Sequence, residues 1–244
     1  MIKTAEILAI ENSCKLGDET FKYVLNQIKL GVSEKQLAFE IKSFIKKHGA
    51  DVSFAPIVAF GKNSAFPHHK PTNQELLIND QILIDLGVKL NGYCSDMSRT
   101  VFFGKPTIEQ KRMYQTVLEA QKRAIEYIQK CHSKLVSESR AKARSRNKFG
   151  MTGKEVDKIA REYIVSQGYP PIPHSLGHGI GRKVHEPPKL SPKSKDILMP
   201  GMVFTIEPGI YIKGFGGVRI EDVVVLENYR PQLLTIAPSA IILL

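Results

Sequence analysis

Two helix-length segments of this chain share one pattern, and the repeat restricts the folds that the chain can adopt. One segment reads GVSEKQLAFEIKSFIKKHG from Gly31, and the other reads GMTGKEVDKIAREYIVSQG from Gly150. Ser33 and Thr152 can each cap a helix whose apolar residues recur at helical spacing and whose end is marked by a glycine. The repeat predicts two halves related by a pseudo-twofold axis. The alternative is a chance similarity between two amphipathic helices.

Hydrophobic periodicity predicts helices and strands in each half. We expect helices over 4–28, 33–49, from Thr107 onward and over 152–168, and strands over 53–60, 81–104, 202–212 and 216–226. Thr107, with Gln110 three residues later, has the capping-box pattern that opens a long helix.

The composition is that of a chain that buries its own hydrophobic core. At 244 residues and 42% hydrophobic, it can form one domain or two fused halves. We expect a single domain over 1–244, with a first half over about 1–131, a basic insertion over about 132–148 and a second half over about 149–244. No apolar stretch has membrane-spanning length, and the N-terminal region lacks the apolar core of a signal peptide. A cytoplasmic location is expected, without a membrane partner.

The net charge is +11, with Lys and Arg spread widely, and one segment, SESRAKARSRNK, is enriched in them. Its basic residues are Arg140, Lys142, Arg144, Arg146 and Lys148. A run of this kind over 140–148 can contact nucleic acid, the ribosome or an acidic partner. A solvated helix end and loop explains the same charges without a partner, and this is the interpretation that we favour.

A predicted hairpin brings two aspartates together in the first half. Asn91-Gly92 is a strong turn signal, and counting outward from it places Asp85 opposite Ser98. Asp96 then lies on the same face as Asp85, as its diagonal neighbour about 7–8 Å away. Two carboxylates so placed repel each other unless a cation lies between them. The alternative is a pair of surface aspartates, but the apolar arms of the hairpin indicate burial.

Three histidines stand in a glycine-rich segment of the second half, HSLGHGIGRKVHE. They are His174, His178 and His185, within twelve residues. Gly177 and Gly179 flank His178 and allow the backbone to approach closely. Imidazole binds several transition metals, and a neighbouring histidine can move protons or bind substrate. A lone histidine would more often be structural, but this clustering favours a functional site.

Two glutamates lie in apolar strand patterns, and a buried glutamate needs a partner. Glu207 occurs in GMVFTIEPGIYI and Glu221 in GFGGVRIEDVVVL. Arg219 could pair with Glu221 on one face of its strand, which is the structural alternative for Glu221. Glu207 has no cation nearby in the sequence, which favours a metal. Asp222 points to the opposite strand face and is left out of the site.

Four carboxylates and one imidazole therefore form the candidate ligand set. Its members are Asp85, Asp96, His178, Glu207 and Glu221. Buried carboxylates without cations would become neutral instead of staying charged. Two divalent metals would hold all five residues, and a paired-metal centre is suited to hydrolysis.

With these residues in view, the chain resembles the dinuclear metallopeptidases of the pita-bread fold. This group contains methionine aminopeptidase, Xaa-Pro aminopeptidase, prolidase and creatinase. The motifs DLGVKLNGYCSDMSRT, GHGIG with HE downstream, EPG and RIED carry the resemblance, which covers essentially the whole chain. It implies an α+β pita-bread (creatinase/aminopeptidase) fold: two pseudo-twofold-related halves with an antiparallel sheet core and outer helices. It leaves a homodimer open.

Three local motifs are similar to the proline-specific branch of that group. His68 follows Pro67 in SAFPHHKPT, His174 lies four residues before His178, and Arg219 stands in GGVRIED. The resemblance thus implies an aminopeptidase or dipeptidase acting on Xaa-Pro peptides with a free N-terminus. The alternatives are a methionine aminopeptidase that removes initiator Met and a non-catalytic scaffold of the same fold that binds a partner or RNA. Retention of all five ligands weighs against the scaffold.

The resemblance also implies a metal role for each ligand. Asp85 binds one metal, His178 and Glu207 bind the other, and Asp96 and Glu221 bridge the two. Manganese is the expected metal, with cobalt, iron or zinc as alternatives. The metals activate a hydroxide that attacks the first peptide bond.

Four further roles follow from the same resemblance. Glu207 is the expected proton acceptor, while His68, His174 and His185 bind substrate or stabilise the oxyanion. Arg219 is expected to contact substrate.

Overall fold

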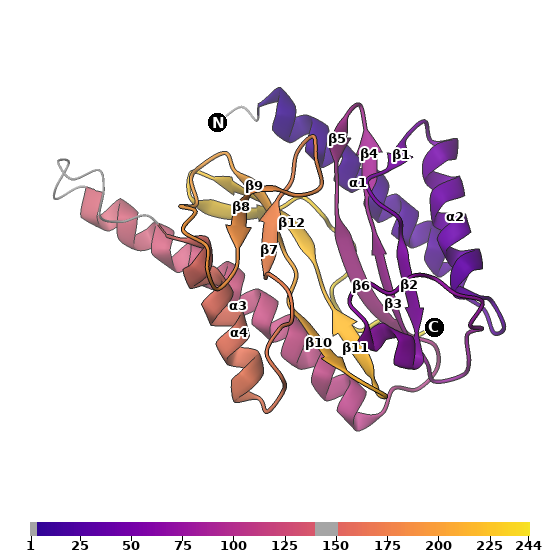
Figure 1. The fold of residues 1–244 in the computed structure, drawn as a ribbon. Coiled ribbons are helices and arrows are strands. Elements are labelled where there is room, and N and C mark those ends of the chain that lie inside the picture. Colours follow the sequence, from indigo (N-terminus) through magenta and orange to yellow (C-terminus); the bar gives the residue numbers. More distant parts are fainter. Residues whose placement is uncertain (1–3, 140–150) are drawn as a thin grey trace.

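Antiparallel sheets form the centre of the molecule, and helices cover them on the outside (Figure 1). The computed structural model describes residues 4–139 and 151–244, with only the helical backbone over 132–139. The helices are α1 (Ala5–Leu25), α2 (Glu34–Lys47), α3 (Ile108–Ser139) and α4 (Gly153–Ser166), with a short 3₁₀ helix η1 (Gly61–Ala65).

The strands divide between the two halves of the chain. In the first half they are β1 (Asp51–Val52), β2 (Ile57–Phe60), β3 (Gln81–Leu86), β4 (Val88–Leu90), β5 (Tyr93–Cys94) and β6 (Met97–Phe102). In the second half they are β7 (Gly177–Gly179), β8 (Glu186–Leu190), β9 (Val203–Ile206), β10 (Gly209–Ile212), β11 (Gly216–Arg219), β12 (Asp222–Glu227) and β13 (Arg230–Leu233).

Each half builds its own sheets. The first half contains the antiparallel sheets β2-β3-β6 and β1-β4-β5, which α1 and α2 cover. The second half contains β13-β12-β9-β7-β8 and the β10-β11 pair, with α3 and α4 packed against them. Figure 1 shows the two sets of strands side by side, with α1 and α2 next to the first set and α3 and α4 next to the second. The expected α+β class with outer helices is confirmed.

The repeated helices begin in the same way. Ser33 Oγ accepts a hydrogen bond from Gln36 N, and the Gln36 side chain accepts one from Ser33 N. Thr152 and Glu155 form the same capping box at the start of α4. Both helices have 14 residues, so the repeat read from the sequence corresponds to two matching helices.

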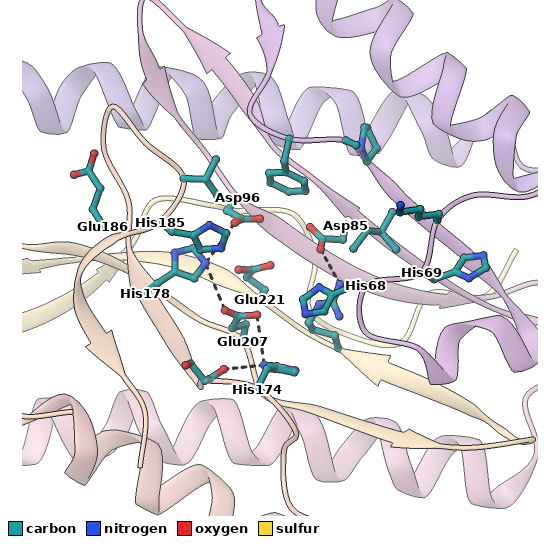
Figure 2. Close-up of a pocket in the computed structure, with 18 of the residues that line it drawn as sticks. His68, His69, Asp85, Asp96, His174, His178, His185, Glu186, Glu207 and Glu221 are labelled. Atoms are coloured by element: carbon teal, nitrogen blue, oxygen red, sulfur yellow. Dashed lines mark hydrogen bonds and ion pairs between the residues drawn. The ribbon is translucent and has the colours of Figure 1, made fainter. Parts of the chain in front are cut away.

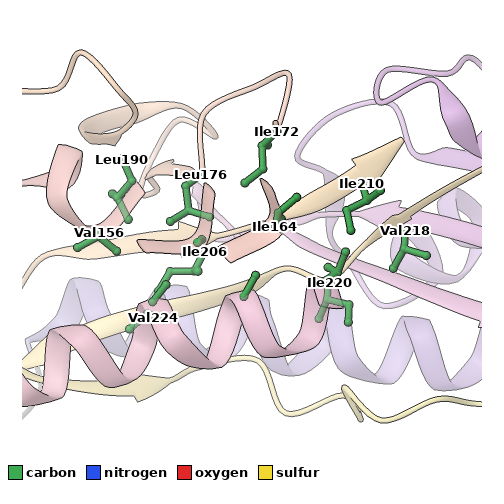
Figure 3. Packing of buried hydrophobic residues seen from close by; sticks show 14 of the residues in the cluster. Val156, Ile164, Ile172, Leu176, Leu190, Ile206, Ile210, Val218, Ile220 and Val224 are labelled. Atoms are coloured by element: carbon green, nitrogen blue, oxygen red, sulfur yellow. The ribbon is translucent and has the colours of Figure 1, made fainter. Parts of the chain in front are cut away.

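Each half also has its own hydrophobic core. In the second half, Val156 and Ile164 of α4 pack with Ile206 and Val224 of the large sheet (Figure 3). In the first half, the apolar face of α2 packs against the sheet β2-β3-β6. A third apolar cluster packs α1 against β9 and β12, so apolar contacts also join the two halves. The candidate ligands lie where the halves meet.

The expected long strands are interrupted at several candidate ligands. The segment 81–104 forms four strands because β3 ends at Leu86, and a Cβ at Gly87 would overlap the carbonyl oxygen of Ser95. The segments 202–212 and 216–226 each form two strands, with breaks after β9 and after β11. Glu207 and Glu221 stand at these breaks. Their amide groups donate instead to Leu176 O at 2.7 Å and Ser98 O at 3.0 Å, so the breaks leave neither amide without a partner.

Other boundaries also differ from the sequence predictions. The first helix ends at Leu25 rather than at 28, and the segment 53–60 contains only the strand β2. Strands β1, β7, β8 and β13 lie outside the predicted strands, because short or glycine-rich segments have no clear alternation of apolar and polar residues.

The basic insertion is only partly covered by the described residues. Helix α3 continues to Ser139, so the first part of the segment 132–148 has a helical backbone. The contact considered for 140–148 lies outside the described residues. Within the described chain, no helix is long and apolar enough to cross a membrane.

A buried arginine joins the two halves. Arg99 on β6 is 1% exposed and donates to Glu221 O at 2.6 Å and to Asp222 Oδ1 at 2.6 Å. It also donates to Ala237 O at 2.7 Å. Asp222 additionally accepts from Gln121, so its carboxylate serves this junction and not the candidate site, as expected.

We predict that Arg99→Met lowers the free energy of unfolding by about 3–5 kcal/mol, because the substitution leaves the buried Asp222 carboxylate without its charged partner. Urea unfolding of the full chain would measure the loss. Lys158→Met is the control, since Lys158 pairs with Glu162 on the exposed face of α4. Lys158→Met should change the free energy of unfolding by no more than about 0.5 kcal/mol. Equal losses in the two variants would contradict the role given to Arg99.

Candidate metal centre

The five predicted ligands converge where the two halves meet. All five line one cavity of about 770 Å³, and Figure 2 shows them pointing toward its centre. Asp85 comes from β3, and Asp96 directly precedes β6. His178 lies in β7, while Glu207 and Glu221 follow β9 and β11. Segments far apart in the sequence therefore contribute to a single site.

The hairpin count in the first half is confirmed. Leu90 pairs with Tyr93 next to the Asn91-Gly92 turn, and Asp85 pairs with Ser98. Asn91 has a positive φ of 52°, as this kind of turn requires. The two aspartates consequently face the same cavity.

His178 faces the carboxylates with a free lone pair. Its Nδ1 lies 3.2 Å from Gly179 O, which orients the ring as an Nδ1–H donor and leaves Nε2 unprotonated. That Nε2 lies 3.5 Å from Glu207 Oε1 and 3.7 Å from Asp96 Oδ2. Burial lowers the pKa of His178 to about 4, so the ring is neutral at neutral pH. A lone pair facing carboxylate oxygens calls for a proton or a cation between them.

The glycines around His178 permit this approach. A Cβ at Gly177 would overlap the carbonyl oxygen of Thr205, and a Cβ at Gly179 would overlap that of Pro187. The prediction that glycine lets the backbone approach closely here is confirmed.

The carboxyl groups of the cavity have raised pKa values, as expected for carboxyl groups that gather to bind cations. Burial, followed by the charges of neighbouring carboxylates, raises the pKa of Asp96 and that of Glu207 well above their usual range. Burial, with the nearby Asp85 charge, raises the pKa of Glu221 to about 8. Asp85 Oδ1 is buried and has no hydrogen-bond partner among the described atoms. Ligand atoms of Asp96, His178 and Glu221 all lie within 4.8 Å of one another, so this donor set fits divalent metal.

Arg219 connects the two half-sites. Its Nη2 donates to Asp85 Oδ2 at 2.7 Å, and its Nε donates to Ser98 Oγ at 2.8 Å. The Ser98 hydroxyl in turn donates to Glu221 Oε2 at 2.8 Å. Arg219 therefore forms its ion pair with Asp85 and reaches Glu221 only through Ser98. The prediction that Arg219 contacts substrate stays a prediction.

The three predicted substrate-side histidines line the same cavity as the ligands. Figure 2 shows His185 next to His178, and the two rings lie 4.3 Å apart. His68 is exposed on the segment after η1 and lies on the Asp85 side. His174 Nδ1 lies 3.8 Å from Glu207 Oε2, and burial lowers the pKa of His174 to about 4.

Tyr211 contacts two residues that line the cavity, and the sequence did not single it out. Its hydroxyl lies 2.9 Å from His174 Nε2 and accepts a hydrogen bond from Arg219 Nη1 at 2.9 Å. Burial raises the pKa of Tyr211 to about 12, so the phenol keeps its proton. A Cβ at Gly209 would press against the Tyr211 ring. The sequence signal for this packing was EPGIY, in which a glycine stands two residues before the tyrosine and leaves room for its ring.

Asp157 and Arg161 of α4 also escaped the sequence prediction. Their ion pair is 2.8 Å long, and Arg161 Nη2 donates to His174 O at 2.9 Å. Asp157 Oδ1 accepts from Leu176 N at 3.2 Å. The pair fixes the segment that carries His174.

Known proteins are similar to this chain in sequence and in fold. The family model for metallopeptidase family M24 matches residues 9–228. The uncharacterized peptidase YqhT of Bacillus subtilis is 39% identical over 100% of this chain and 65% of its own length. The Xaa-Pro dipeptidase of Pyrococcus furiosus is 40% identical over 96% of this chain and 63% of its own.

Solved structures agree with the sequence relatives. A structure of Xaa-Pro dipeptidase from Bacillus anthracis superposes with a TM-score of 0.87 at 38% identity, over 100% of this chain and 64% of that one. The structure of X-Pro aminopeptidase from Thermotoga maritima superposes with a TM-score of 0.87 at 37% sequence identity, over 100% of this chain and 64% of that one. The predicted pita-bread fold is confirmed. The chain spans less than two thirds of the length of these proteins.

We predict that metal binding releases protons. Carboxyl groups with a raised pKa hold protons in the metal-free chain, and a divalent cation must displace them. Calorimetric titration of the chelated chain with Mn²⁺, in two buffers with different ionisation enthalpies, should give two ions per chain and buffer-dependent heats. Affinity should fall as the pH is lowered from about 8, because protons then compete more strongly.

Glu186→Gln provides the control for this titration. Glu186 lines the cavity but accepts from Lys183 N, and it lies outside the ligand set. Its substitution should leave the stoichiometry unchanged, whereas Glu221→Gln should reduce it. Identical heats in the two buffers would show that the cluster carries no displaceable protons.

Proposed function

The chain belongs to metallopeptidase family M24, and we propose that it is a metal-dependent exopeptidase that hydrolyses the N-terminal peptide bond of Xaa-Pro substrates. One observation carries the proposal: the five candidate ligands and the three predicted substrate-side histidines line a single cavity. The names of the relatives support the substrate class, since several are Xaa-Pro dipeptidases or an X-Pro aminopeptidase.

The five ligands would hold two divalent ions. Asp85 would bind one ion, His178 and Glu207 the other, and Asp96 and Glu221 both. Bound there, the ions would polarise the scissile carbonyl and lower the pKa of water to near neutrality. The oxygen-rich set favours manganese, and its imidazole is also compatible with cobalt, iron or zinc.

Glu207 is the proposed proton acceptor. Its carboxylate lines the cavity among the other candidate ligands, where it can accept a proton from a water molecule held there. It lies within 3.8 Å of both His174 and His178, so a proton that it receives stays inside the cavity. The neutral ring of His174 is held by Ser175 O and Tyr211, in a position to orient a peptide group. His68 and His185 would contact substrate or the developing oxyanion from the opposite sides of the cavity.

Two wider inferences accompany this assignment. We infer that the two halves act as one catalytic domain, because each supplies part of the ligand set. A cytoplasmic site of action fits the free cysteines Cys14, Cys94 and Cys131, since thiols persist in a reducing compartment. The homodimer stays an open alternative, and a contact through 140–148 stays the less favoured alternative to a solvated segment.

We expect an Xaa-Pro peptide to be cleaved faster than a Met-Ala peptide. The expectation rests on His68, His174 and Arg219, which match the proline-specific motifs and line the cavity. The measurement is kcat/KM for a panel of both peptide types with the manganese-loaded full chain, and the chelated chain serves as the blank. A tenfold preference for Met-Ala, about 1.4 kcal/mol of transition-state binding, would favour methionine aminopeptidase instead.

We predict that Glu207→Gln lowers turnover by at least about 10²–10⁴-fold at saturating metal, because the amide keeps one coordinating oxygen but loses the basicity. Asp85→Asn is the matched variant, since it changes a ligand that has no proton-transfer role. Its activity should recover partly as metal is added. Rescue of Glu207→Gln to near the parent rate by excess metal would make Glu207 a ligand only, and His185 the next candidate for the base.

A further inference from the structure

Glu34, the first residue of α2, has a carboxylate that is completely buried outside the metal centre. Five hydrogen bonds reach it. Oε1 accepts from Phe60 N at 2.9 Å and from Asn63 Nδ2 at 2.9 Å. Oε2 accepts from His69 Nε2 at 2.8 Å, from Thr72 N at 2.8 Å and from Thr72 Oγ1 at 2.7 Å.

These donors bracket a cavity histidine. Phe60 and Asn63 precede His68, and His69 and Thr72 follow it, so one carboxylate ties both sides of the segment 60–72. His68 itself is exposed and lines the cavity. Its direction is therefore set by a backbone whose two ends are fixed to the same group.

The helix does not need Glu34 for its own stability. Ser33 and Gln36 already complete the capping box of α2. In the second half, α4 has the same cap, but Gly153 stands where α2 has Glu34. The carboxylate of Glu34 is therefore not part of the cap that the two helices share.

Glu34 is ionised in its buried position. Burial acts to raise its pKa, but the hydrogen bonds from Asn63, His69, Phe60 and Thr72 outweigh burial and lower it. A charged acceptor forms stronger hydrogen bonds than a neutral one, so the segment is held firmly at neutral pH.

We propose that Glu34 is a positioning residue that directs His68 toward the metal centre. The inference rests on the proposed function, because contact between His68 and substrate belongs to that proposal. Glu34 is not among the residues that line the cavity, and its hydrogen bonds go to residues outside the candidate ligand set. It acts through the segment 60–72, and we expect its substitution to leave the five ligands in place.

The test compares Glu34→Gln with Asp18→Asn. Glutamine keeps the shape of the side chain but turns an NH₂ group toward donors that need an acceptor. Asp18 is the matched control, since its carboxylate accepts from Ile236 N and Ala237 N in the C-terminal segment, which carries no cavity histidine. We expect Glu34→Gln to lower kcat/KM for an Xaa-Pro peptide at least tenfold with unchanged manganese content, and Asp18→Asn to change it less than twofold.

A double-mutant cycle separates positioning from general destabilisation. In a His68→Ala background, Glu34→Gln should lower kcat/KM less than twofold further, because the group that it positions is already gone. The conservative Glu34→Asp should recover part of the loss. An equal tenfold loss in both backgrounds would overturn the proposal.

Amide hydrogen exchange gives a readout that does not depend on activity. Exchange over 60–72 should accelerate in Glu34→Gln and stay unchanged in Asp18→Asn. If the parent protein cleaves no peptide of the panel, the proposed function fails while this measurement still tests the positioning. Thr72→Val removes one of the five donors from an exposed side chain and replaces Glu34→Gln if that variant does not fold. Unchanged exchange in both variants would overturn the proposal.

Discussion

Repulsion among four carboxylates, three of them buried and one partly buried, is the constraint on which the rest of the structure depends. Asp85 and Asp96 come from one half, and Glu207 and Glu221 come from the other. Neither pair is neutralised within its own half. Arg219 crosses to Asp85, and the remaining charge must be met by protons or cations. The fold holds these carboxylates closer together than their mutual repulsion would otherwise allow. The sheets, the strand breaks and the glycines around His178 all contribute to this arrangement.

Much of this site could be predicted from local sequence patterns. The Asn91-Gly92 turn sets the register that places Asp85 opposite Ser98, because a two-residue turn leaves only one pairing. A glutamate inside an apolar strand, as with Glu207, indicates burial and hence a partner. The caps of the two repeated helices were equally visible, since a capping box is formed within four residues.

The remaining features depend on contacts between distant segments, which local patterns do not encode. The breaks at Glu207 and Glu221 exist because their amide groups bond to Leu176 and Ser98, in segments that lie elsewhere in the sequence. The donors around Glu34 lie 26 to 38 residues further along the chain. Its position at the start of α2 suggested only a favourable charge near a helix N-terminus. Apolar periodicity cannot distinguish such an acid from a solvent-exposed one.

The contacts across the junction have a consequence for how the cavity is reached. Arg99, Arg219 and Ser98 connect β6 to β11 and β12 through hydrogen bonds that also orient the ligands. A hinge between the halves would have to break these bonds and dismantle the centre at each opening. We therefore expect the halves to stay joined as one frame during entry and exit. Access then depends on the rim, where the segments 54–57 and 184–187 line the cavity, and variation in those segments can alter what enters without disturbing the frame.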